Sequence, residues 1–273
     1  RAARELQLPR AVVAGGGGDN AASAAGLGVV APGQAFLSLG TSGVLFVVTD
    51  RFRPNPERAA HAFCHCFPGR WHQMSVMLSA AATLDWVAQL TGESDLHRLV
   101  DAARSRRLSR QSPFFLPYLS GERTPHNDPR ARGVFFGINP DTNAADLAGA
   151  VLEGVALAFA DGLDVLIEKG GSVDEISITG GGARLPYWGE LLAAALGRPL
   201  AYRAGSEVGA ALGAARLARL AVSGEKAEDV CVPPAIERLV QPDATLVTLL
   251  ADRRHTFMRL YQDLKSSFKE FST

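Results

Sequence analysis

The sequence lacks the features that would place it in several specialised classes of protein. No apolar run is long enough to span a bilayer as a helix. No charged start leads through an apolar stretch to a small-residue cleavage site, as in a secretory signal. The cysteines number three, without a Cys-x-x-Cys pair, which argues against a disulfide framework and favours a reducing, cytoplasmic setting. Basic and acidic residues balance at 28 each, so neither nucleic acid nor a membrane is indicated as a partner.

What the sequence does contain is typical of a globular α/β protein with a substantial core. Of its 273 residues, 47% are hydrophobic, and glycine (28) and proline (15) are plentiful. Hydrophobic periodicity predicts paired strands first and then helices alternating with strands, which indicates the α/β class. Strands are predicted at 34–39, 44–49, 62–67, 71–78, 114–119, 175–179 and 200–202, and helices at 21–30, 80–91, 96–106, 146–168, 186–196, 208–221 and 244–268.

Three glycine-rich turns stand out, at residues 15–18, 40–43 and 180–182. Glycine at such turns lets backbone N–H groups approach an anion, and a following helix N-terminus adds positive potential. None of the turns has the Gly-Lys-Ser/Thr ending of a phosphate-binding Walker loop, and none matches a dinucleotide-binding fingerprint. Taken singly, each is explained equally well as a tight turn with no ligand.

The residues beside these turns indicate which chemistry they could perform. Gly40 is followed by the hydroxyls of Thr41 and Ser42, which suit donation to phosphate oxygens. The bare backbone of residues 180–182 could accept a flat ring or a ribose. Asp19 follows the first glycine run at an expected helix start, where a carboxylate anion is stabilised by the helix dipole. A plain helix N-cap is the alternative role for Asp19.

Taken together, these segments resemble the FGGY-type carbohydrate kinases, in order and at similar spacing from about residue 10 to the end. The matching segments are residues 13–22 (Val-Ala-Gly-Gly-Gly-Gly-Asp-Asn-Ala-Ala), 37–43 (Leu-Ser-Leu-Gly-Thr-Ser-Gly), 114–125 (Phe-Phe-Leu-Pro-Tyr-Leu-Ser-Gly-Glu-Arg-Thr-Pro), 133–137 (Gly-Val-Phe-Phe-Gly) and 178–183 (Ile-Thr-Gly-Gly-Gly-Ala). The resemblance implies a ribonuclease H-like fold of the actin and hexokinase type, with a mixed sheet flanked by helices. Two such domains clasp ATP, Mg²⁺ and a sugar between them.

The chain begins without methionine, and the resemblance places it in the second half of such a kinase. Residues 1–14 are then the end of a sugar-binding domain or a linker, and residues 15–273 are the nucleotide-binding domain. The implied partners are ATP, a sugar and the missing N-terminal domain. The face left open by that domain could instead pair two copies of the chain.

The resemblance also implies roles for individual residues. Asp19 matches the catalytic base, and Gly181 and Gly182 match the adenosine-binding turn. Gly40, Thr41 and Ser42 match a second phosphate-binding turn, in which Thr41 is the main side-chain contact. Ala81 and Asp85 fall where distant members contact the nucleotide at a helix start, although Asp85 could simply cap or decorate its helix.

The favoured sugar is D-xylulose, phosphorylated at its 5-hydroxyl, because residues 16–22, 71–72, 74–79 and 121–127 are most similar to members acting on that sugar. Ribulose, gluconate and glycerol are the alternative substrates, and a nucleotide-binding module without catalysis is the alternative class. The Mg²⁺ ligands are expected in the missing half. The polar loop at 120–130 is either a solvated turn or a cleft-edge loop. A metal site at Cys64, His65 and Cys66 is not favoured, because on a strand Cys64 and Cys66 would share one face while His65 points to the other.

Overall fold

The computed structural model describes residues 2–5, 7, 12–168 and 170–271. Part of the predicted linker, at residues 1, 6 and 8–11, lies outside the described residues. Strands are β1 (Ala35–Leu39), β2 (Gly43–Thr49), β3 (His61–Cys64), β4 (Trp71–Met77), β5 (Phe114–Leu116), β6 (Val134–Phe136), β7 (Ile176–Thr179), β8 (Leu200–Arg203) and β9 (Ile236–Val240). Helices are α1 (Ala2–Glu5), α2 (Asp19–Leu27), α3 (Ala82–Thr91), α4 (Leu96–Arg106), α5 (Ala144–Ile167), α6 (Pro186–Leu196), α7 (Gly209–Ser223), α8 (Ala227–Val230) and α9 (Ala244–Phe271), with 3₁₀ turns η1 (Pro56–Arg58), η2 (Gly181–Arg184) and η3 (Ser206–Val208).

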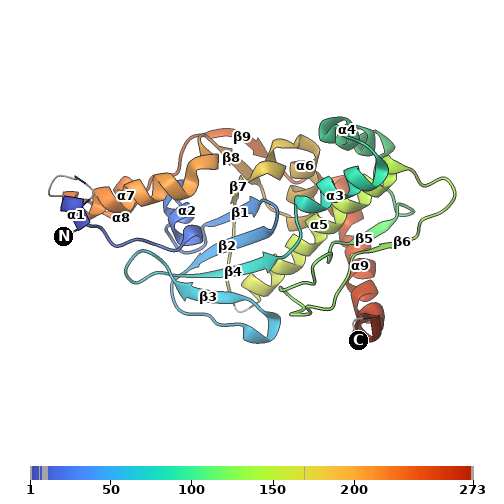
Figure 1. Ribbon diagram of the computed structural model, residues 1–273, viewed down its shortest axis with the longest axis horizontal. Coiled ribbons are helices and arrows are strands. Elements are labelled where there is room, and N and C mark those ends of the chain that lie inside the picture. Colours follow the sequence, from blue (N-terminus) through green and yellow to red (C-terminus); the bar gives the residue numbers. More distant parts are fainter. Residues whose placement is uncertain (1, 6, 8–11, 169, 272–273) are drawn as a thin grey trace.

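A seven-stranded mixed sheet in the order β3-β4-β2-β1-β7-β8-β9 forms the centre of the molecule (Figure 1). The central strands β1, β7 and β8 are parallel, whereas β3, β4, β2 and β9 join antiparallel to their neighbours. The predicted hairpin of β1 and β2 and the mixed sheet are therefore confirmed. Strands β5 and β6 form a separate two-stranded ribbon.

Helices cover both faces of this sheet because apolar side chains alternate along its strands. In β1, Leu37 and Leu39 belong to the large core that also contains α3, α5, α6 and α9. Phe36 points the other way and packs with Phe46 against Leu27 of α2. Helix α7 in turn packs on α2. The sheet thus separates the layer that contains α2 and α7 from the layer that contains α3, α5 and α6.

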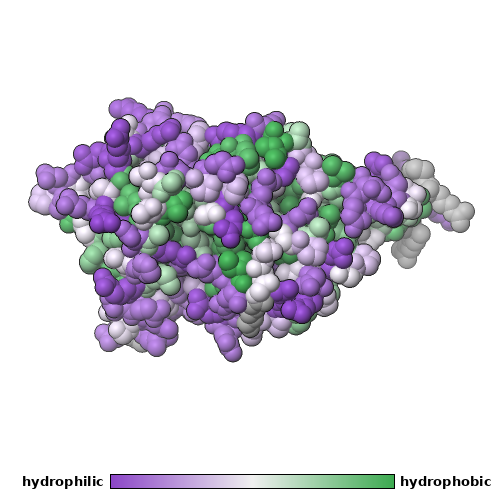
Figure 2. All heavy atoms as spheres, turned by 180° about the vertical axis from the view of Figure 1, so that it is seen from behind, coloured by the Kyte–Doolittle hydropathy of each residue, from purple (hydrophilic) through white to green (hydrophobic). Residues whose placement is uncertain are grey.

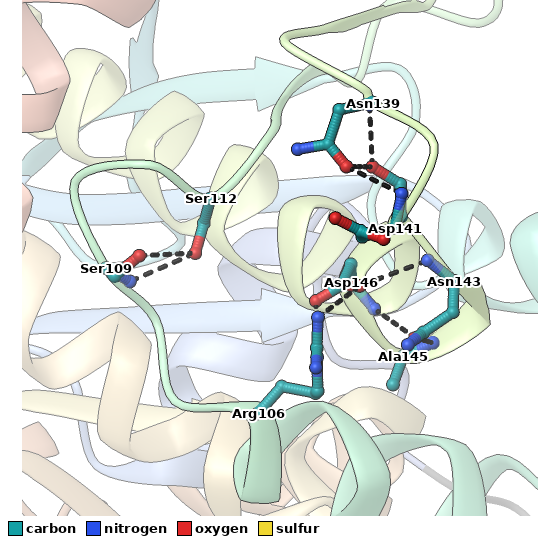
Figure 3. A network of polar contacts seen from close by, with 9 residues as sticks. Arg106, Ser109, Ser112, Asn139, Asp141, Asn143, Ala145 and Asp146 are labelled. Carbon is teal, nitrogen blue, oxygen red and sulfur yellow. Dashed lines mark hydrogen bonds and ion pairs between the residues drawn. The ribbon is translucent and has the colours of Figure 1, made fainter.

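The deeply buried helix α5 is fixed at its start by a network of polar contacts (Figure 3). Asn143 and Asp146 form a reciprocal capping box, in which each side chain accepts a hydrogen bond from the other residue's backbone N–H. Arg106, at the end of α4, donates to both carboxylate oxygens of Asp146 at 2.8 and 3.0 Å. These contacts fasten the end of α4 to the start of α5.

Two strands were not predicted from the sequence. Strand β9 has Glu237 and Arg238 at its centre, and its residues are mostly exposed, so its apolar residues show no alternation. Strand β6 contains only three residues. Strand β3 ends at Cys64, so Cys66 lies beyond it and donates to the Ala21 carbonyl at 3.4 Å. The expectation that Cys64 and Cys66 share one face of a strand was therefore wrong.

The outer surface mixes polar and apolar side chains. Figure 2 shows hydrophobic patches set between hydrophilic ones on the face turned away in Figure 1. Exposed apolar side chains include Val208, Ile236 and Leu239. None of the described helices is long and apolar enough to span a bilayer.

A buried aromatic group under α2 makes the fold sensitive to acid. His72 stacks on Phe46 with the ring centroids 4.4 Å apart, and His65 lies edge-on to both rings. Burial lowers the pKa of His65 and of His72 to about 4. Because both pKa values are lower than in the unfolded chain, the unfolded state binds more protons between pH 6.5 and pH 4. The free energy of unfolding should therefore fall as the pH drops through this window.

Replacing His72 by phenylalanine should remove one of these titrating groups and keep the aromatic stack. Between pH 7 and pH 5, the variant should lose about 2 kcal/mol less unfolding free energy than the parent chain. Urea unfolding at both pH values measures this difference. The same substitution at the exposed His255 is the control. An equal acid sensitivity of parent and His72→Phe would show that His72 does not contribute.

Candidate nucleotide-binding cavity

The turn between β1 and β2 is held against the start of α3 by its backbone. The carbonyl of Gly40 accepts a hydrogen bond from the N–H of Ala81 at 2.8 Å, and that of Thr41 accepts one from the N–H of Ala80 at 2.9 Å. The side chains of Thr41 and Ser42 are exposed, and their hydroxyls have no hydrogen-bond partner within the described part of the chain. The backbone of this turn is therefore held in place by hydrogen bonds, whereas its hydroxyl groups are exposed and available to a ligand.

The second turn lies at the end of the neighbouring parallel strand, β7. Gly180 has φ +96°, and a Cβ there would come within 2.6 Å of the Leu39 carbonyl, so only glycine fits. At Gly181 an added Cβ would meet nothing within 4 Å. Helix α6 follows η2 directly. Gly180 thus has a structural role, whereas Gly181 presents bare backbone to an open space.

The two turns and the start of α3 enclose one cavity of about 440 Å³. Six of the predicted nucleotide contacts line it, namely Gly40, Thr41, Ala81, Asp85, Gly181 and Gly182. Ser42 belongs to the same turn but does not line the cavity. The fold thus brings residues that are far apart in the sequence to the wall of one cavity.

The rest of the cavity wall was not predicted from the sequence. It consists of Ala82, Leu84, Leu96, Leu185 and Trp188. Trp188 is fully buried and donates from its indole N–H to the Leu152 carbonyl at 3.0 Å. An apolar wall facing a few polar groups is usual for a pocket that accepts a flat ring. Sequence periodicity cannot separate such residues from ordinary core.

The two glycines of the second turn offer a matched test of the cavity. Gly181→Val should fill open space and raise the nucleotide Kd at least about tenfold, with little change in the unfolding free energy. Gly180→Ala should instead lower the unfolding free energy by about 1–3 kcal/mol, because its Cβ meets the β1 backbone. Calorimetric titration with ADP and urea unfolding measure the two effects. Unchanged ADP binding by a folded Gly181→Val variant would place the nucleotide elsewhere.

Asp85 lies in the first turn of α3 with an exposed carboxylate on the cavity wall. The N-cap position of α3 is Ala81, and no side chain caps the helix there. Asp85 therefore does not cap its helix and is available to a ligand in the cavity.

Asp19 lies outside this cavity, at the start of α2 on the other side of the sheet. The N-cap position of α2 is Gly18, without a side-chain cap, so the plain N-cap role predicted as an alternative for Asp19 is not observed. The carboxylate is exposed and accepts hydrogen bonds from the backbone and side-chain nitrogens of Asn20, at 2.8 and 3.2 Å. Asp19 is therefore open to a reactant approaching this edge of the fold.

The polar loop at residues 120–130 is neither a solvated turn nor part of the cavity wall. Glu122, Thr124 and Asp128 are buried, and the ring of His126 stacks on Tyr261 of α9 at 3.5 Å between centroids. None of its residues lines the cavity. Within the ranges described above, no group of three His, Cys, Asp or Glu side chains is placed to hold a metal ion.

Comparison with known proteins identifies related sequences over most of the chain. The C-terminal domain profile of the FGGY family of carbohydrate kinases matches residues 35–222. The chain is 52% identical to a xylulose kinase of Escherichia coli over 92% of this chain and 52% of that protein, and 50% identical to one of Klebsiella pneumoniae over 96% and 54%. The chain therefore spans about half the length of these curated relatives.

Solved structures place the fold in the same group. A xylulose kinase from Brucella ovis is 43% identical and superposes with a TM-score of 0.91, covering 97% of this chain and 55% of that one. One from Rhodospirillum rubrum is 27% identical with a TM-score of 0.86, covering 98% and 55%. The fold is thus that of the actin- and hexokinase-like ATPases.

Proposed function

Because this chain belongs to the FGGY family of carbohydrate kinases, we propose that it is the nucleotide-binding half of an enzyme that phosphorylates D-xylulose. Kinases of this family use ATP, with Mg²⁺ as the usual partner ion. The observation that carries the proposal is the single cavity into which Gly40, Thr41, Asp85 and Gly181 converge. The choice of D-xylulose is supported by the relatives at 50–52% identity, which are xylulose kinases.

The chain forms the second of two domains in this proposal. Residues 15–273 are the nucleotide-binding domain, and residues 1–14 connect it to a preceding sugar-binding half. The length of the relatives, about twice that of this chain, supports this division. Without the other half, the chain should bind adenine nucleotide weakly and turn over almost no sugar.

The residues that line the cavity support one orientation of the nucleotide. The adenosine lies against the bare backbone of Gly181 and Gly182, with the apolar wall of Leu185 and Trp188 around it. Its phosphates leave the cavity along the turn of Gly40, where the free hydroxyls of Thr41 and Ser42 donate to phosphate oxygens. Thr41 is the principal side-chain contact because it alone of the two hydroxyl residues lines the cavity.

Asp19 acts as the general base in this scheme. Its carboxylate accepts the proton of the sugar 5-hydroxyl while that oxygen bonds to the γ-phosphorus and the bond to the ADP oxygen breaks. Phosphoryl transfer is loose, so the proton moves late and an ordinary carboxylate is a sufficient base. Positioning of the two reactants supplies most of the remaining acceleration.

Mg²⁺ would neutralise charge on the phosphates as they react. Of the two carboxylates named in this proposal, Asp85 lines the cavity and Asp19 lies outside it, and no three-residue metal cluster occurs among the described side chains. The carboxylates that would help hold the ion are expected in the other half of the protein.

Coupled ADP release from ATP by the two-domain protein tests this proposal. D-xylulose should give a higher kcat/KM than D-ribulose, gluconate or glycerol. A preference for another of these sugars would support the assignment as a sugar kinase and contradict the choice of D-xylulose as its substrate. ATP binding without turnover of any sugar would instead indicate a nucleotide-binding module that performs no phosphoryl transfer.

A further inference from the structure

The end of strand β4 has no neighbouring strand on its outer edge. Strand β3 pairs with β4 only from Trp71 to Met74. Beyond that point the loop at residues 120–130 takes the place of a strand. Thr124 exchanges two hydrogen bonds with Val76, its N–H donating to the Val76 carbonyl and its Oγ1 accepting from the Val76 N–H, each at 3.1 Å.

Glu122 makes a similar contact two residues further along the chain from Val76, at Leu78. Its Oε1 accepts a hydrogen bond from the backbone N–H of Leu78 at 3.0 Å and a second from the N–H of Arg123 at 2.7 Å. The spacing of Glu122 and Thr124 equals that of Leu78 and Val76, so the two side chains accept from successive amides that point outward from the uncovered edge of β4. Glu122 is 2% exposed, and its Oε2 has no partner among the described residues. Burial raises the pKa of this carboxyl to about 8.

The Leu78 amide, which donates to Glu122, lies in the sequence just before residues of the cavity wall. Leu78 is the first residue after β4, and Ala80 and Ala81 follow two and three positions later. Their N–H groups are the donors to the carbonyls of Thr41 and Gly40. A displacement at Leu78 would therefore be transmitted through a short, rigid segment to the turn that faces the phosphates.

The loop is fastened independently on its other side, to α9. Asp128 accepts a hydrogen bond from the Tyr261 hydroxyl at 3.1 Å, and the His126 ring stacks on the same tyrosine. Backbone bonds between Glu122 and Asp128 close the loop on itself at 2.9 and 2.8 Å. Glu122 is thus the end of the loop that faces the cavity, and Asp128 is the end that faces α9.

We propose that Glu122 is a positioning residue for the nucleotide site. By accepting the hydrogen bond of the Leu78 amide, it fixes the backbone where the chain leaves β4 and thereby positions Ala80 and Ala81 against the Gly40 turn. This inference rests on the proposed function, because it assigns the nucleotide to that cavity. Glu122 contacts neither nucleotide nor sugar and acts only through the Leu78 amide.

The two-domain protein with Glu122→Ala should show a KM for ATP, and a Kd for ADP, raised about 10- to 100-fold, since small misplacements at a binding site have effects of this size. The KM for D-xylulose should stay within about threefold of the parent value, because most of the sugar pocket belongs to the other half. Glu122→Gln should restore ATP KM to within about threefold, because its amide oxygen still accepts from the Leu78 N–H.

The matched control is Asp128→Ala, which removes an equally buried carboxyl from the same loop. It should lower the melting temperature as Glu122→Ala does and leave ATP KM unchanged. Where Glu122→Ala does not fold, Glu122→Asp shortens the reach to Leu78 by one methylene and should raise ATP KM in the same way.

Three results would overturn the assignment: an unchanged ATP KM in folded Glu122→Ala and Glu122→Asp, an equal rise in Asp128→Ala, or no rescue by Glu122→Gln. Failure of the proposed function looks different, because the parent protein would then release no ADP with any sugar. Binding of ADP by the parent separates the two cases.

Discussion

Replacing Asp19 by asparagine is expected to lower kcat of the two-domain kinase by about 10²–10⁴-fold, the usual contribution of a general base. Asparagine keeps the size of the side chain and cannot take up the sugar proton. ATP binding should be unchanged, because Asp19 lies outside the nucleotide cavity and on the other side of the sheet. Single-turnover kinetics with D-xylulose, together with calorimetric titration of ADP, measure the two quantities separately.

A second helix-start aspartate provides the control for this substitution. Asp243 accepts a hydrogen bond from the N–H of Leu246 at the start of α9, far in sequence from the cavity residues. Asp243→Asn should leave both kcat and ADP binding at the parent values. Full activity of Asp19→Asn would contradict the assignment of the base and leave Asp19 as a surface residue of the first turn of α2.

Replacing Arg253 by methionine is expected to lower the unfolding free energy of the chain by about 3–5 kcal/mol. Arg253 and Glu153 are 3% and 1% exposed, and the guanidinium donates to Glu153 Oε2 at 2.7 Å. It also donates to the carbonyls of Ser109 and Pro113 and lies over the Phe114 ring at 3.9 Å. Its loss would leave a buried carboxylate and at least two carbonyls without their donor.

Urea unfolding of three variants tests this pair. Adding Glu153→Leu to Arg253→Met should recover part of the loss, because the buried charge is removed with its partner. Arg110→Met breaks the exposed pair with Asp252 and should cost at most about 1 kcal/mol. A loss below about 1 kcal/mol for Arg253→Met would mean that the buried pair is compensated by water or by rearrangement.

The sequence was sufficient to locate the glycine-rich turns that border the cavity, whereas the roles predicted for their residues come from the family resemblance. The turns at residues 40–43 and 180–182 each follow a strand whose apolar residues can be recognised in the sequence. The parallel pairing of β1 with β7 then brings the two turns to one edge of the sheet. Asp85 could be placed by family resemblance but not by its own helix, which has no distinctive capping pattern.

The remaining parts depend on contacts that no local pattern records. Leu185 and Trp188 have the same periodicity as buried core, and only the packing of α6 beside the second turn makes them cavity wall. The role of Glu122 depends on β3 being too short to cover the end of β4. Strand β9 is held by pairing with β8 rather than by burial, and because charged residues lie at its centre, hydrophobic periodicity did not predict it.

The structure of the two-domain protein crystallised with ADP tests the central claim most directly. The account predicts that the adenosine lies against Gly181 and Gly182, with Asp85 on the facing wall and the β-phosphate within hydrogen-bond distance of the Thr41 hydroxyl. Density for ADP at any other hollow of the molecule, with the cavity between β1, β7 and α3 empty, would contradict it.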